Sequence, residues 1–348
     1  MNELLQQLTE TVGVSGDEKA VRLLIRDLIQ DHVDEWHIDP MGNLIAHKKG
    51  TGASDLKIML DAHMDEVGLM LTEAHSDGTF SFQCVGGFDD RALLGKIVQV
   101  GEKNVPGVIG ARPVHLLSGG EYTRVVKRDT MRVDIGAASK EAAQKHGSPG
   151  DRAAFLTSYE ELEQVALGKA FDDRVGCALI IELLRGEPFP FDLYASFTVQ
   201  EEVGLRGATT AAYHIQPDAA FILDCTPAYD LPHPANADGD TSPNVALGLG
   251  PAVYVMDSGT IQDPRLVSYL LNTAAQNDLP IQIRKPGGGG TNTASVQKIA
   301  GGTAVATISV PGRYLHAPTS MIHLDDYKHT LALLEAALRN FTAEIIHR

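Results

Sequence analysis

Hydrophobic positions recur along this chain at two spacings, one typical of helices and the other of strands. Apolar residues at helical spacing predict amphipathic helices over residues 15–32, 172–183 and 324–346. The first of these begins with Ser-Gly-Asp-Glu at residues 15–18, which has the form of a capping box. The Asp-Pro pair at residues 263–264 predicts the start of a further helix, because aspartate caps helices and proline is favoured in their first turn.

Short apolar runs between these helices predict strands. They cover residues 44–46, 56–60, 193–199, 219–223 and 303–310. Continuous apolar runs of this kind are typical of strands that are buried on both faces of a sheet. Strands that alternate with helices predict an α/β domain, with an open and mostly parallel sheet flanked by helices.

The pattern changes between residues 70 and 164. Short β-like segments at 79–85, 96–100, 105–109 and 131–135 are separated there by glycine and proline turns. This pattern is typical of a small β-barrel or sandwich. We therefore expect two domains: an α/β domain made of residues 1–69 and 165–348, and a β-rich insert made of residues 70–164. A chain of 348 residues is long enough for both.

Composition and charge exclude several classes of partner. The chain has 29 Lys and Arg against 45 Asp and Glu, a formal net charge of −16, which repels nucleic-acid phosphates. No apolar run approaches the roughly 18 residues of a membrane helix. The first residues lack the basic start and apolar stretch of a signal peptide.

Three cysteines without a Cys-x-x-Cys pair, Cys84, Cys177 and Cys225, favour reduced thiols and a cytoplasmic location.

Residues of metal-ligand type follow the ends of four predicted strands. Ligands of open α/β sheets bind beyond the carboxyl ends of the strands. These positions and the helix start near residue 172 hold His63, Asp65, Asp172, Asp173, Glu201, Glu202, Asp224 and His316. Each one alone is compatible with a solvated strand end or a helix cap, but together they favour a metal site. Imidazoles and carboxylates suit zinc or cobalt, and there are enough of them for two ions that share a carboxylate.

Four segments around these residues resemble the signature segments of the dinuclear metallo-aminopeptidases of metallopeptidase family forty-two. They are AHMDEVG at 62–68, FDDRVG at 171–176, QEEVG at 200–204 and RYLHAP at 313–318. The resemblance runs from the first helix to the last, and in the insert it includes PVHLL at 113–117 and VDIGA at 133–137. It implies an aminopeptidase that removes N-terminal residues from short peptides with two divalent ions, Zn²⁺ or Co²⁺, and a water that bridges them.

The same resemblance implies a role for each candidate residue. The implied metal ligands are His63 and Asp224 on one ion, Glu202 and His316 on the other, and Asp172 on both. Glu201 would be the general base, and Asp65 would orient His63, from which it is separated by two positions. The insert would be a dimerisation domain, and the dimers would assemble into a hollow tetrahedral dodecamer.

Two features near the site leave alternatives open. The bridging ligand could be Asp172 or Asp173; the resemblance favours the first. The sequence Phe-Asp-Asp-Arg of residues 171–174 also occurs at 88–91, but only the later copy precedes a helix with an apolar face. Where the family has Gly-Gly-Thr-Asp-Ala, this chain has Gly-Gly-Thr-Asn-Thr at 289–293, so that Asn292 replaces a carboxylate that could position bound peptide.

Other hydrolases are the competing interpretations. A carboxypeptidase or deacylase with a related dinuclear centre would share the metal chemistry, and only recognition elements would distinguish it. A glycosidase needs two carboxyls roughly 5–9.5 Å apart that face one bond, whereas Glu201 and Glu202 are adjacent and diverge. No Gly-x-Ser-x-Gly elbow supports a serine hydrolase.

The segment after Asp224 suggests which substrates are preferred. Residues 225–229 carry no cation that could pair with an acidic side chain. This predicts a preference for neutral or apolar N-terminal residues over Glu or Asp. Arg284 and Lys285, which precede the glycine-rich stretch, could overturn that expectation if they point into the site.

Overall fold

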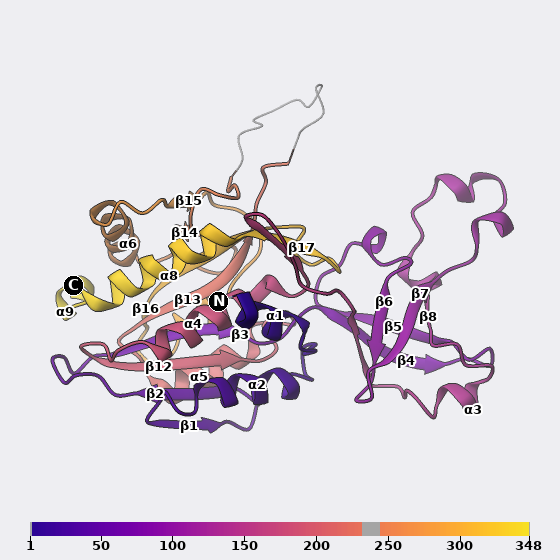
Figure 1. The fold of residues 1–348 in the computed structure, drawn as a ribbon, viewed down its shortest axis with the longest axis horizontal. Coiled ribbons are helices and arrows are strands. Elements are labelled where there is room, and N and C mark those ends of the chain that lie inside the picture. Colours follow the sequence, from indigo (N-terminus) through magenta and orange to yellow (C-terminus); the bar gives the residue numbers. More distant parts are fainter. Residues whose placement is uncertain (1, 232–243, 348) are drawn as a thin grey trace.

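The computed structural model of the chain describes residues 2–231 and 244–347. It contains an α/β domain built on an 11-stranded sheet, and beside it a closed barrel of six strands (Figure 1). The predicted fold class, an open sheet flanked by helices with an inserted small barrel, is confirmed. Within the described ranges, no helix is long and apolar enough to cross a membrane.

Parallel strands occupy the middle of the large sheet. In sheet order they are β12 (Asp192–Thr198), β3 (Lys57–His63), β13 (Ala219–Pro227) and β16 (Ala304–Arg313). Antiparallel strands flank them: β1 (Glu35–Ile38) and β2 (Leu44–Lys48) on one side, and β17 (Ser320–His323), β11 (Val165–Gly168) and β10 (Glu160–Leu162) on the other. The short β14 (Ala252–Tyr254) and β15 (Gln282–Arg284) branch from β16. The parallel strands therefore end at one edge of the sheet.

Helices cover both faces of this sheet. On one face lie α4 (Phe171–Arg185), α6 (Pro264–Gln276) and α8 (Leu324–Arg339), with α1 (Asn2–Glu10) and α2 (Lys19–Ile29) packed against α4. On the other lie α5 (Arg206–Ile215) and the short α7 (Thr293–Val296). Each face of the sheet therefore has its own hydrophobic core. On strand β13, Phe221 packs into the larger core, on the side of α4, α6 and α8, and Ile222 packs into the smaller core, on the side of α5 and α7. Alternate residues of a strand point to opposite faces, so a buried central strand needs apolar residues at every position.

The barrel has a core of its own. Around it run β4 (Gly68–Ala74), β5 (Phe80–Val85), β8 (Arg132–Asp134), β7 (Val105–Gly110), β6 (Ile97–Val100) and β9 (Arg152–Phe155). Its interior is filled by buried side chains such as Leu71, Phe80, Val98 and Val133. Its strands lie between Gly68 and Phe155, and the chain has re-entered the large sheet by β10. The function of the barrel in dimerisation stays a prediction.

The helix boundaries differ from the predicted ones at both ends of the chain. The capping box at residues 15–18 is wrong: α2 begins at Lys19 without a side-chain cap, and the Ser15 hydroxyl donates instead to the buried carboxylate of Asp65, 2.6 Å away. The last helix ends at Arg339, and α9 (Ala343–Ile346) is separate. Phe341 lies between them and packs edge-on against Phe221, because the turn directs it into the core. The Asp-Pro helix start at residue 264 is confirmed, since Asp263 accepts a hydrogen bond from the first turn.

Candidate metal centre

The candidate ligands meet at the carboxyl ends of the parallel strands. They line one cavity of about 270 Å³, together with the glycine-rich loop at residues 288–290. The predicted residues on its wall are His63, Asp172, Glu201, Glu202, Asp224 and His316. A larger hollow of about 610 Å³ lies near the opposite ends of β13 and β16, beside Asp218 and Thr303, and has no histidine among its lining residues. The strand topology thus gathers the candidate chemistry in the smaller cavity.

The carboxylate of Asp172 lies between two imidazoles. Its Oδ1 is 3.1 Å from Nε2 of His63, and its Oδ2 is 3.5 Å from Nε2 of His316. Glu202 Oε1 is 3.3 Å from the same nitrogen of His316. One carboxylate therefore faces a separate potential ligand with each of its oxygens, which is the arrangement that a bridging ligand requires.

Main-chain carbonyls fix the orientation of both imidazoles. Nδ1 of His63 is 2.9 Å from the carbonyl oxygen of Asp65, and Nδ1 of His316 is 3.1 Å from that of Gly87. A carbonyl oxygen only accepts hydrogen bonds, so in the neutral ring the proton lies on Nδ1. Nε2 is then free to bind a metal, on the side that faces the carboxylates.

Asp65 supports the site from behind the cavity. Its buried carboxylate accepts hydrogen bonds from the Ser15 hydroxyl and from the backbone N–H groups of Glu201 and Glu202, at 2.6, 3.0 and 3.2 Å. The same carboxylate is 3.5 Å from Nδ1 of His63. The closest contact with the ring therefore comes from the Asp65 carbonyl, while the carboxylate fixes the turn that carries both glutamates.

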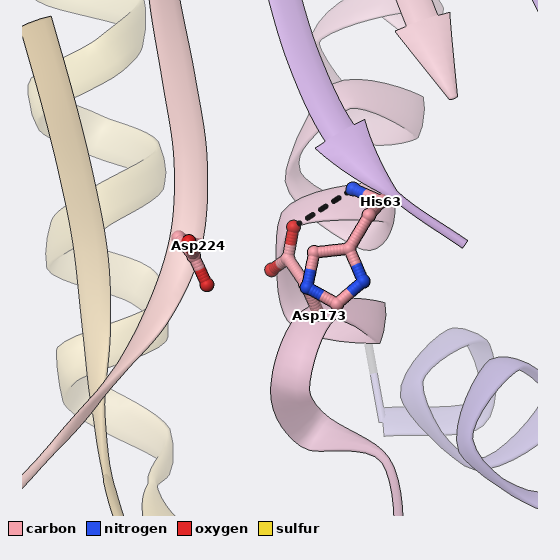
Figure 2. A group of neighbouring side chains, drawn as sticks. All are labelled: His63, Asp173 and Asp224. Carbon is pink, nitrogen blue, oxygen red and sulfur yellow. Dashed lines mark hydrogen bonds between the residues drawn. The ribbon is translucent and has the colours of Figure 1, made fainter. Parts of the chain in front are cut away.

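Asp173 is turned toward the backbone of its neighbours. Figure 2 shows its carboxylate beside His63. The backbone N–H of His63 donates to Oδ2 at 3.3 Å, and the backbone N–H of Gly176 donates to Oδ1 at 2.9 Å. Among the residues that the structure describes, two sets of side chains have potential ligand atoms within 4.8 Å of one another: His63, Asp173 and Asp224 in one, and His63, Asp172 and Glu202 in the other. Both neighbouring aspartates are thus placed near His63, but only Asp172 also contacts His316.

The electrostatics of the cluster favour bound cations. Burial, followed by repulsion from Asp172, raises the pKa of Asp224, and burial and the surrounding carboxylates also raise the pKa of Glu201. Burial by itself would lower the pKa of both histidines. Hydrogen bonds with Asp172 and Asp65 nevertheless raise the pKa of His63 well above its usual value, and those with Asp172 and Glu202 raise the pKa of His316 to about 11. A field that holds protons this strongly also attracts divalent ions, and the oxygen and nitrogen donors suit zinc or cobalt.

Left-handed backbone conformations flank the cluster. Ala170, Gln200 and His316 have φ of 54°, 56° and 56°. Such conformations cost side-chain-bearing residues about 1–3 kcal/mol each and persist only where surrounding contacts impose them. They occur just before Asp172, just before Glu201 and at His316 itself. The fold therefore positions the side chains of the candidate ligands at the cost of an unfavourable backbone conformation beside them.

Two supporting groups could not be identified from the sequence. The local pattern predicts a helix cap at Ser15, and its actual partner, Asp65, lies fifty positions away along the chain. Gly87 acts through its carbonyl, so no side-chain pattern could have identified it. The repeated Phe-Asp-Asp-Arg in the insert has a different use, since Asp89 pairs with Arg91 and Asp90 with Arg128.

Asn292 lies in the protein interior rather than on the cavity wall. Its Nδ2 donates to Oδ2 of Asp61 at 2.8 Å and to the Thr198 hydroxyl at 3.0 Å. Burial raises the pKa of Asp61 to about 6, although hydrogen bonds from Ser196 and Asn292 oppose the shift. An aspartate at position 292 would place a second carboxylate against Asp61. The amide thus supplies a donor to a buried acid beneath the site.

Comparison with known proteins agrees with this geometry. Residues 42–333 match the profile of the M42 glutamyl aminopeptidase family. The chain is 38% identical over 341 residues to a putative aminopeptidase of Acetivibrio thermocellus, covering 97% of this chain and 98% of that protein. It is 33% identical over 351 residues to the lysyl aminopeptidase of Pyrococcus furiosus, covering 97% and 96%.

A solved structure extends the likeness to the whole fold. The TET1 peptidase of Pyrococcus horikoshii superposes with a TM-score of 0.86 at 34% identity, covering 97% of this chain and 99% of that one. That peptidase can assemble into a tetrahedron or a large octahedral shell. Both the α/β domain and the barrel are therefore shared with a known peptidase.

The geometry predicts different effects for the two adjacent aspartates. Asp172→Asn removes the carboxylate that both imidazoles face, so bound metal should be lost and excess Zn²⁺ should not restore full occupancy. Asp173→Asn should weaken metal binding only about 10- to 100-fold, as is usual for groups behind the ligands, and excess Zn²⁺ should restore it. Elemental analysis after dialysis, with and without added zinc, measures this. The reverse order of effects would make Asp173 the shared ligand.

Proposed function

The chain belongs to the M42 glutamyl aminopeptidase family and is a metal-dependent aminopeptidase, and from this premise we propose that it removes N-terminal residues from short peptides in the cavity described above. The observation that carries the proposal is the placement of Asp172 between the outward nitrogens of His63 and His316. The cavity, about 270 Å³, is slightly smaller than typical pockets of about 300–1,000 Å³. It therefore suits the end of a peptide.

We infer that this donor set holds two divalent ions. We assign His63, Asp172 and Asp224 to one ion and Asp172, Glu202 and His316 to the other, with Zn²⁺ or Co²⁺ as the metal. When bound, such ions supply Lewis acidity, which polarises a carbonyl group and lowers the pKa of water. The Asp65 and Gly87 carbonyls hold the histidines in the tautomer that this arrangement needs.

Glu201 is the residue best placed to move a proton. Its backbone is fixed by Asp65, and its side chain lines the cavity beside the ligands. Glu202 is directed to His316, so the two adjacent glutamates are available for different tasks. We assign Glu201 as the general base that takes a proton from the attacking water and then gives it to the departing amine.

Removal of metal should abolish activity. A chelator followed by gel filtration should leave a protein that does not cleave aminoacyl substrates, because carboxylates and imidazoles alone cannot polarise the scissile carbonyl as a cation does. Stoichiometric addition of Zn²⁺ or Co²⁺ should restore activity as occupancy approaches two ions per chain. Peptidase rates and elemental analysis on the same samples test this. Full activity in protein shown to be free of metal would refute it.

Replacement of Glu201 should separate catalysis from metal binding. Glu201→Gln keeps the size of the side chain but removes its basic site, so kcat should fall by a factor of at least about 10²–10⁴ with metal content unchanged. Glu202→Gln is the matched comparison: it should weaken one metal position, and added metal should recover part of its activity. A fully metallated Glu201→Gln enzyme within a few-fold of the parent would move the role to another carboxylate.

We propose that the chain also assembles with copies of itself through the insert at residues 70–164, as dimers that build a dodecamer. Two observations support this. The structurally similar TET1 peptidase can assemble into a tetrahedron or a large octahedral shell. The insert also exposes large apolar side chains, among them Ile97, Val114, Leu116 and Val125. A contiguous apolar patch formed by such residues is typical of a surface that a partner covers.

A charge placed on that surface should reduce the assembly. Val114 and Leu116 are 64% and 52% exposed, and the double variant Val114→Glu, Leu116→Glu should give smaller species than the parent in light scattering. Tyr213→Glu is the control, since Tyr213 is 67% exposed on α5, away from the insert. A parent protein that is monomeric at micromolar concentration would contradict the proposed assembly.

The location of the protein is a further part of this proposal. Cys84, Cys177 and Cys225 are all free thiols. Burial raises the pKa of the Cys177 and Cys225 thiols, which keeps them protonated and unreactive. Unpaired, inert cysteines suit a reducing compartment, and we infer the cytoplasm.

A further inference from the structure

Arg284 is a buried cation on the wall of the same cavity. It is the last residue of β15 and lies directly opposite Tyr254 on β14. Only 5% of its surface is exposed, yet it lines the cavity together with the candidate metal ligands. Its neighbour Lys285 is exposed and does not line the cavity. The structure therefore brings one of these two cations, and not the other, to the site.

Two contacts hold the guanidinium, and neither of them comes from a carboxylate. It stacks over the ring of Tyr254 at 4.3 Å, and its Nη2 donates to the carbonyl of Gly288 at 2.8 Å. Its Nη1 is buried without a hydrogen-bond partner. Among residues 2–231 and 244–347, no carboxylate lies within 4.0 Å of it in an ion pair. By contrast, Arg313 forms two hydrogen bonds with the carboxylate of Asp230.

An unpaired buried charge is unfavourable, and an anion that enters the cavity would relieve it. The fork of N–H donors on arginine matches the geometry of a carboxylate or a phosphate, and of these two groups an ordinary peptide carries the carboxylate. The stacking on Tyr254 and the bond to Gly288 fix the side chain in advance, so binding would cost little conformational entropy. These contacts point to a site for a carboxylate a short distance from the candidate metal centre.

We propose that Arg284 binds a carboxylate of the peptide substrate and thereby determines which peptides are cleaved fastest. This inference rests on the proposed aminopeptidase function. Two carboxylates of a short peptide have the required chemistry: the side chain of an N-terminal Glu or Asp, and the C-terminal carboxylate of a dipeptide. The expectation of neutral or apolar N-terminal residues depended on the absence of an inward cation. Arg284 is a cation of this kind, because it lines the cavity, and it therefore overturns the expectation that acidic N-terminal residues are disfavoured.

The side-chain source is tested with p-nitroanilides, which have no terminal carboxylate. The parent should show a higher kcat/KM for glutamyl than for glutaminyl p-nitroanilide. In Arg284→Gln this ratio should fall roughly 10- to 100-fold, as expected for loss of a charged hydrogen bond. Arg284→Lys keeps the charge and should recover part of the ratio. Lys285→Gln removes a charge one position away and should leave the ratio at the parent value.

The C-terminal source is tested with leucyl-glycine and its amide. If the terminal carboxylate is the group bound, Arg284→Gln should lower the ratio of acid to amide rates, while the glutamyl to glutaminyl ratio is unchanged. The inference is overturned if neither ratio falls in Arg284→Gln while the variant still cleaves leucyl p-nitroanilide and is still inactivated by a chelator. Loss of all cleavage in the metal-loaded parent would instead overturn the proposed function itself, and this inference with it.

Discussion

Repulsion among buried carboxylates is the constraint on which the active edge of this sheet depends. Asp172, Glu201, Glu202 and Asp224 converge there from separate elements of the fold, in surroundings that raise the pKa of most of them. Groups of like charge remain together in a protein interior only when rigid elements hold them and when cations or hydrogen-bond donors offset their charge. The histidines supply part of that compensation, and the proposed metal ions would supply most of it.

The supporting contacts show how the fold meets this constraint. Asp65 is more deeply buried than Asp172, Glu201 and Glu202, and it accepts hydrogen bonds from Ser15 and from the backbone of Glu201 and Glu202. It therefore acts as a fixed anion behind the cavity and ties the segment before α2 to the turn after β12. The left-handed residues beside the site have the same origin, since packing and hydrogen bonds impose a conformation that the local chain would avoid. The insert contributes as well, because its Gly87 carbonyl orients His316.

Much of the fold and most of the candidate site could be predicted because the relevant signals are local. An apolar run long enough for one strand, followed by His or Asp, is visible without knowing its neighbours. Once such strands are taken as parallel, the residues after each must share an edge of the sheet. The predicted edge holds His63, Glu201, Glu202, Asp224 and His316, and the structure shows these residues around one cavity. The prediction failed at Ser15, where a local capping pattern competed with a stronger long-range acceptor.

By itself, the sequence determined the order and type of the main elements, the presence of a β-rich insert and the residue types available for metal binding, because periodicity and side-chain chemistry are properties of short segments. Only the tertiary structure decided which atom holds each imidazole, which of two adjacent aspartates faces both histidines, and whether Arg284 or Lys285 enters the cavity. Those outcomes depend on the register of strands far apart in the chain and on backbone carbonyls. Neither can be read from the local pattern of side chains. Every residue has the same backbone carbonyl, and a one-residue shift in register reverses the side to which every side chain of a strand points.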